Sequence, residues 1–166
     1  MKSALRNLKI NKGFTLIELL VVIGILAILL SIVLIAINPA RQFGQANDTR
    51  RRSEVTQILN AVGAYAADNK GLLPVGIPTD DPLTPAIEFL PIASGIDPLL
   101  VADICALIMP KYIPALPQDP QQGTGTAITD CSSYVTGYTI VQDANGRVTV
   151  AAPLTEQATP DISNTR

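Results

Sequence analysis

Residues 14–37 form an apolar run of 24 residues that contains a single charged side chain, that of Glu18. As a helix, a run of this length extends about 36 Å, which is enough to cross the hydrocarbon core of a bilayer. A charged side chain inside such a span is costly, so acids are rare there and usually functional. The run therefore predicts a membrane-spanning helix in which Glu18 has a role beyond anchoring.

Two simpler interpretations of the apolar run explain less. A secretory signal peptide has a shorter apolar region followed by a small-residue cleavage site, and segment 36–40 fits such a site poorly. A plain single-span anchor agrees with the basic residues before the run, which would keep the N-terminus in the cytoplasm and the remainder outside. It explains neither Glu18 nor the junction between Gly13 and Phe14.

The start of the run carries the motif Lys12-Gly13-Phe14-Thr15-Leu16-Ile17-Glu18-Leu19. Residues 12–38 resemble the class III signal of type IV pilins and of the pseudopilins of type II secretion. The resemblance implies that a prepilin peptidase cuts between Gly13 and Phe14 and methylates the new amine of Phe14. It also implies assembly into a helical filament, in which the Phe14 amine of one subunit meets Glu18 of another.

The chain is expected to have five parts. They are a leader that the peptidase removes (1–13), the transmembrane and filament-core helix (14–37), the amphipathic half of the same helix (38–70), a globular head (71–152) and a loose C-terminal tail (153–166). Pro39 is expected to kink the helix, because proline lacks an amide hydrogen. The alternative is that Asn38 caps a new helix whose first residue is Pro39.

Beyond Pro39 the apolar residues recur at helical spacing. Such a stripe predicts an amphipathic helix that serves as the spine of the head, with Gly71 as its stop. The stripe consists of Val55, Ile58, Leu59, Val62, Tyr65 and Ala66, whereas Asp48 and Glu54 are placed off it. The basic residues 50–52 are interpreted as a solvated helix face that pairs with nearby acids, in preference to a DNA or lipid contact.

The head combines proline-rich loops with a β-hairpin signal. Residues 72–97 are predicted to be loop, and a short helix is expected from Asp97 to about Met109. Segments 138–141 and 148–151 flank Asn145-Gly146, a pair typical of hairpin turns. The predicted fold class is α+β, with the long N-terminal helix packed against a small antiparallel sheet.

Composition limits the chemistry that this chain can perform. It contains no His, which is the commonest general base, and it has no nucleophile or phosphate-loop motif. Cleavage would lower Lys+Arg from 12 to 8 against 14 acids, so the net charge would change from −2 to −6. An acidic product does not favour DNA binding. The chain is therefore predicted to be neither an enzyme nor a cofactor-binding protein.

Cys105 and Cys131 are the only cysteines, and in an exported head they are expected to form a disulfide. Two buried free thiols are the alternative. The oxygen-rich segment 119–130 offers Asp119 and Asp130 for calcium, as the resemblance to major pseudopilins suggests. Two acids in twelve residues are few for such a site, so a plain turn is favoured and no metal is predicted.

The resemblance implies a structural subunit that polymerises through its N-terminal helix. One interpretation is a pilin in an extracellular filament for adhesion, twitching motility or DNA uptake. The alternative is the major pseudopilin of a type II secretion-like system, which forms a short periplasmic piston. Either way the implied precursor crosses the cytoplasmic membrane once with its head outside. The implied partners are identical subunits, the prepilin peptidase, and an assembly platform with its ATPase.

Overall fold

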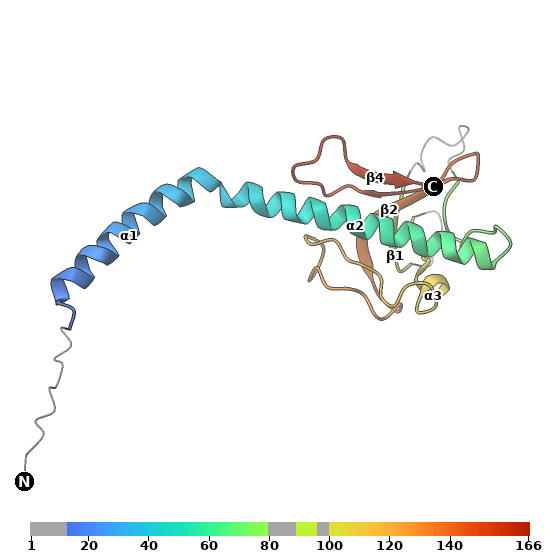
Figure 1. Ribbon diagram of the computed structural model, residues 1–166. Helices are drawn as coiled ribbons and strands as arrows, with labels where there is room; N and C mark the ends of the chain where they lie inside the picture. The colour runs from blue at the N-terminus through green and yellow to red at the C-terminus, as the bar shows by residue number, and fades with distance from the viewer. Residues whose placement is uncertain (1–12, 80–88, 96–99) are drawn as a thin grey trace, which may run out of the picture. The chain divides into compact units, whose positions relative to one another are not determined.

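The computed structural model describes residues 13–79, 89–95 and 100–166. Contacts divide the chain into two compact units, Met1–Pro39 and Ala40–Arg166, which are described separately. The helices are α1 (Leu16–Ile37), α2 (Pro39–Asp68) and α3 (Cys105–Ile108), and the strands are β1 (Leu90–Ala93), β2 (Val135–Gln142), β3 (Val148–Ala152) and β4 (Ile162–Thr165) (Figure 1). The predicted α+β class, with a long N-terminal helical region and a small antiparallel sheet, is confirmed.

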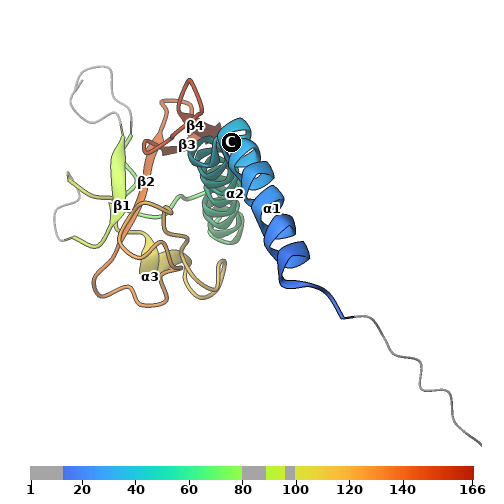
Figure 2. The same cartoon turned by 90° about the vertical axis from the view of Figure 1, so that its left-hand side faces the viewer.

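The four strands form one antiparallel sheet in the order β1-β2-β3-β4, alongside α2 (Figure 2). The hairpin between β2 and β3 turns at Asn145-Gly146, as predicted. Gly146 donates its amide to the carbonyl of Asp143 at 2.9 Å, and its φ of +81° is one that glycine adopts without strain. The sequence pattern therefore located both strands and the turn.

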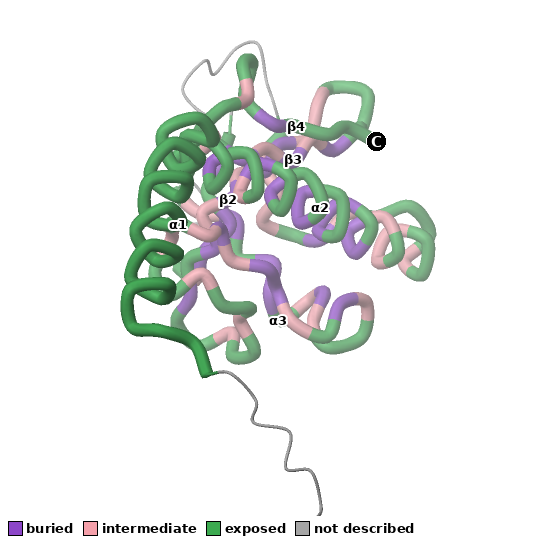
Figure 3. Tube along the Cα trace, turned by 60° about the vertical axis from the view of Figure 1, so that its left-hand side comes forward, coloured by how far each residue is buried: buried purple, intermediate pink, exposed green. Residues whose placement is uncertain are grey.

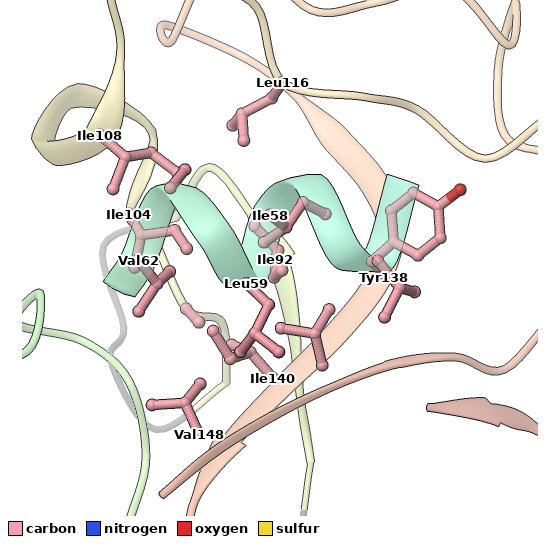
Figure 4. Close-up of a cluster of buried hydrophobic side chains, with 14 of the residues drawn as sticks. Ile58, Leu59, Val62, Ile92, Ile104, Ile108, Leu116, Tyr138, Ile140 and Val148 are labelled. Carbon is pink, nitrogen blue, oxygen red and sulfur yellow. The ribbon is translucent and has the colours of Figure 1, made fainter. Parts of the chain in front are cut away.

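The core of the head lies between α2 and the sheet. Val55, Ile58, Leu59 and Val62 of α2 are buried, whereas Tyr65 and Ala66 of the predicted stripe are only half-buried. Opposite them lie Ile92, Tyr138, Ile140 and Val148, several of which Figure 4 shows around the helix. Burying one such aliphatic side chain contributes roughly 1.5–3 kcal/mol. The other face of α2 is exposed (Figure 3).

The interpretation of residues 50–52 as a solvated face is confirmed for Arg50 and Arg52, which are exposed, and is wrong for Arg51, which is buried on the core-facing side of α2. The side chain of Arg51 has no exposed surface. Its Nε donates to Oδ2 of Asp119 at 2.7 Å, and its Nη1 donates to Oδ1 of Asp48 at 2.8 Å and to Oε1 of Glu156 at 3.2 Å. Pairing of residues 50–52 with nearby acids was predicted, but the pair of Arg51 with Asp48 lies in the interior. Arg51 precedes Val55 by four residues, so helical periodicity places it in line with the apolar stripe.

A second buried acid on α2 is held by the sheet. Glu54, which the sequence placed off the core stripe, accepts a hydrogen bond from the hydroxyl of buried Tyr138 on β2. Its other carboxylate oxygen accepts from Nε of Arg50 at 2.6 Å. Burial raises the pKa of Tyr138, and the hydrogen bond to Glu54 raises it further, so the phenol stays a donor. The carboxylates of Asp48 and Glu54 thus both join α2 to other parts of the head.

Residues 153–166 were expected to be a loose tail, and this prediction is wrong. The amides of Glu156, Gln157 and Ala158 donate to the carboxylate of Asp48 at 3.0, 2.7 and 2.8 Å. Beyond them, β4 pairs with β3 along Ile162–Thr165. The segment has few large apolar residues, so the signal was weak. It is ordered instead by a buried carboxylate and a free strand edge, to which its backbone supplies the hydrogen bonds.

Two further predictions of local structure need correction. Segment 72–97 was expected to be loop, yet residues 90–93 form β1, where Pro91 is tolerated because the strand lies at the sheet edge. The helix predicted from Asp97 begins only at Cys105. Ala102 instead donates its amide to the carbonyl of Pro91 at 2.9 Å, which favours an extended backbone over a helical turn. The predicted cap, Asp97-Pro98, lies outside the described residues.

A glycine on β2 allows the Asp119 carboxylate to reach Arg51. Gly137 has a φ of +83°, and a Cβ built there would lie 2.8 Å from Cβ of Asp119. The amide of Asp119 also donates to the carbonyl of Thr136 at 2.8 Å. The segment that carries Asp119 therefore packs directly on the backbone of β2, which only glycine permits.

The expected disulfide between Cys105 and Cys131 is confirmed, with 5.6 Å between the two Cα atoms. It joins the first residue of α3 to the segment that precedes β2. On the chain-entropy model, closing a loop of this size stabilises a fold by roughly 3 kcal/mol. The proline-rich part of the head is thereby fastened to the sheet.

Replacing Arg51 by Met should destabilise the head strongly. The substitution leaves the buried carboxylate of Asp119 without its cation, and breaking a buried ion pair in this way costs about 3–5 kcal/mol. Chemical denaturation of a fragment containing residues 41–166 would measure the loss. Arg52→Met is the matched control, because Arg52 is exposed on the next position of the same helix. Equal stability of the two variants would contradict the structural role of Arg51.

The head should also lose stability in strong acid through Asp48. Burial would raise the pKa of this carboxyl, but the three amides and the Arg51 guanidinium outweigh burial and lower the pKa from 3.8 to about 2. Its stabilisation, roughly 2 kcal/mol, is therefore complete above pH about 4 and is lost as the pH falls toward 2. Melting curves of the same fragment should show this loss, and Asp48→Asn should reduce it. An unchanged acid dependence in Asp48→Asn would refute the assignment.

Candidate functional site

The candidate processing site lies immediately before α1. Gly13 and Phe14 belong to a short non-helical segment, and both are exposed, Phe14 to 84%. A Cβ built on Gly13 meets no atom of the described residues within 4 Å. The peptide bond between the two residues is therefore open to an enzyme, while residues 1–12 lie outside the described part of the chain.

Glu18 is bound within its own chain by a capping box. Thr15 is the N-cap of α1, and its amide and hydroxyl donate to Oε2 of Glu18 at 2.8 and 2.7 Å. The amide of Glu18 donates in return to the Thr15 hydroxyl at 3.3 Å. Sequence analysis missed the role of Thr15, although a Thr followed three residues later by Glu, ahead of an apolar run, is the signature of this cap. Among the described residues the carboxylate has hydrogen-bond donors but no cation as a partner.

The helix that follows presents its apolar side chains outward. No residue of α1 is buried, and it is the one helix among the described residues that is long and apolar enough to cross a membrane. The hydroxyl of Ser31 donates to the carbonyl of Ala27 at 2.8 Å, so its polar group is satisfied within the helix. Gly24, Ala27 and Ser31, spaced by three and four residues, leave one face of α1 with small side chains.

The two helices are separated at Asn38. This residue is the C-cap of α1 and adopts the left-handed conformation, with φ +48° and ψ +79°. Pro39 follows as the first residue of α2, where its missing amide hydrogen costs nothing. The sequence had left open a kink in one helix or a new helix at Pro39. The backbone breaks at Asn38 and restarts at Pro39, and the role of this break in a filament stays a prediction.

The acids suggested for calcium have other partners. Both carboxylate oxygens of Asp119 accept from the Arg51 guanidinium, at 2.7 and 3.1 Å. Asp130 accepts from the amide and the hydroxyl of Ser132 at 3.0 and 2.8 Å. Within residues 13–79, 89–95 and 100–166 no group of three or more potential metal ligands occurs. A buried carboxylate that is neutralised by arginine does not suit a cation, so Asp119 is assigned to the fold.

The N-terminal segment matches a known family model. The prokaryotic N-terminal methylation motif matches residues 8–34, which include the Gly13–Phe14 junction, Glu18 and most of α1. This motif is the class III signal peptide of type IV pilins and pseudopilins, so the resemblance drawn from the sequence is confirmed. Comparisons with curated proteins and with solved structures found no match.

The motif defines the class of the chain at the level of its signal. It supports a type IV pilin-like or pseudopilin-like protein, and it implies a substrate of a prepilin peptidase and of a pilus assembly system. The apolar helix and the signal fit a precursor that is first anchored in a membrane. Proteins of this kind are structural.

Proposed function

We propose that this chain is the repeating subunit of an extracellular filament, assembled through α1 after cleavage between Gly13 and Phe14. The observation that carries the proposal is the methylation motif on a helix that its own chain leaves wholly exposed. The precursor would cross the cytoplasmic membrane once, with the head outside. The prepilin peptidase would cut it there, and an assembly platform with its ATPase would extract it.

The apolar surface of α1 supplies cohesion once the helix leaves the lipid. Where water would otherwise reach this surface, burial is worth about 25 cal/mol per Å². Inside the bilayer the lipid tails satisfy the same side chains, so helices gain little from association there. Extraction from the membrane therefore needs outside work, whereas the finished filament is held by the helices themselves.

Glu18 would then set the position of each new subunit. A carboxylate in an apolar core is tolerable only with a partner, and cleavage creates one by converting the Phe14 amide into an amine. In the precursor Phe14 has no such charge, and the capping box with Thr15 holds the carboxylate of Glu18. Uncleaved chains would thus lack the cation that pairs with Glu18 of a neighbour.

Glu18→Val should abolish filaments without affecting the head. Glu18 lies in the first unit, and the described core of the head contains no residue of that unit. Electron microscopy and immunoblots of sheared cell-surface material would measure filament yield. Membrane insertion and the melting temperature of the head should stay unchanged. Ser31→Ala is the matched control, because it also removes a polar group from α1 but no charge, and it should assemble normally.

A normal filament yield from cells that express only Glu18→Val would refute the charge-pair mechanism. Wild-type filaments that stop in the periplasm and do not reach the cell surface would favour the alternative function, that of a pseudopilin in a secretion system, over that of a pilin. Wild-type protein that never polymerises in cells with a working assembly system would contradict the proposed function as a whole.

A further inference from the structure

A groove whose lining residues are mostly apolar lies in the head at the C-terminal end of α2. It has a volume of about 520 Å³, and Leu59 and Val62 of α2 contribute to its lining. Leu72, Val75 and Ile77 line it from the segment that follows α2, and Leu72 and Val75 are 70% and 75% exposed. Arg166 is the one charged residue among the described residues that line it. Surface leucines and valines exposed this far, side by side, are typical of a contact surface.

A single aromatic side chain projects from the other end of α2. Phe43 lies in the second turn of the helix and is 70% exposed, which makes it the most exposed aromatic residue among those described in the head. The next residue, Gly44, is buried, and a Cβ there would lie 3.1 Å from Cγ of Gln157. The ordered segment 156–158 thus covers Gly44 on the neighbouring position of α2, whereas the side chain of Phe43 stays exposed to solvent.

We propose that Phe43 of one subunit docks into this groove of the next copy of the same chain. This inference rests on the proposed function, because it needs a polymer. A knob and a pocket at different places on one molecule form a heterologous contact, which does not close on itself and so propagates as a filament. The groove offers apolar walls for the ring and a single cation, Arg166, which complements the negative face of an aromatic ring.

The two sites lie on one rigid element, which fixes the spacing they impose. From Phe43 to the residues of α2 that line the groove, Leu59 to Ala66, the helix extends about 24–35 Å. Copies joined in this way are displaced by about that length along the α2 axis. The contact needs no residue of α1, so it adds head-to-head register to the cohesion that the apolar helices supply.

Cysteine cross-linking in full-length chains tests the contact. The only native cysteines are joined in a disulfide, so introduced thiols are the only free ones. Filaments of the Phe43→Cys/Val75→Cys double variant, oxidised with copper phenanthroline, should give a ladder of covalent oligomers on a non-reducing gel. Phe43→Cys/Leu100→Cys is the matched control, because Leu100 is 65% exposed but does not line the groove, and it should give no ladder.

Filaments of the double variant that form in any yield without a ladder would overturn the contact and leave the proposed function intact. A ladder of equal strength in the control would also overturn it. If the double variant makes no filaments, the filament yields of the single variants Phe43→Ser and Val75→Ser test the contact instead. Each should lower filament yield about tenfold, as the loss of ~1.4 kcal/mol per contact would, with an unchanged melting temperature of the head. Normal yield from either would overturn the contact, whereas absence of wild-type filaments would overturn the function itself.

Discussion

The exposed apolar surface of α1 is the constraint on which the rest of the molecule depends. Its 22 residues include none that is buried, so lipid or other protein must cover them. A chain with such a helix is stable only when the helix lies in a membrane or is packed in an assembly. Thr15 satisfies hydrogen bonds of the helix's single acid, Glu18, through the capping box, and the proposed assembly would add a cation beside that carboxylate.

The described core of the head contains no residue of α1, so the head is expected to be stable without that helix. That core is built from α2, the sheet and the disulfide-linked segments. Arg51 is central to this independence, because it joins α2 to Asp119 and to the C-terminal segment that carries Glu156. A buried ion cluster of this kind contributes less to net stability than to specifying which segments meet. Here it orders stretches that are too poor in apolar residues to order themselves.

The sequence predicted the features that rest on periodicity and on local turn chemistry. The apolar run, the stripe from Val55 to Val62 and the Asn145-Gly146 hairpin each follow from short-range patterns. It did not predict β4 or the late start of α3, since these depend on partners distant in the chain, namely the edge of β3 and the carbonyl of Pro91. The burial of Arg51 was misjudged and the capping role of Thr15 was missed, although the sequence spacing of each residue indicated its role. A charge in line with an apolar stripe was interpreted as solvated, and a capping box was overlooked beside a more conspicuous motif.

The N-terminus of assembled protein tests the central claim most directly. Intact-mass and N-terminal peptide analysis of filaments sheared from wild-type cells would show where the subunit begins. Cleavage between Gly13 and Phe14 predicts a chain that starts at Phe14, with the added mass of one methyl group on its amine. Surface filaments whose subunits retain the leader and begin at Met1 would contradict the account, because the Phe14 amine that is proposed to pair with Glu18 would never have formed.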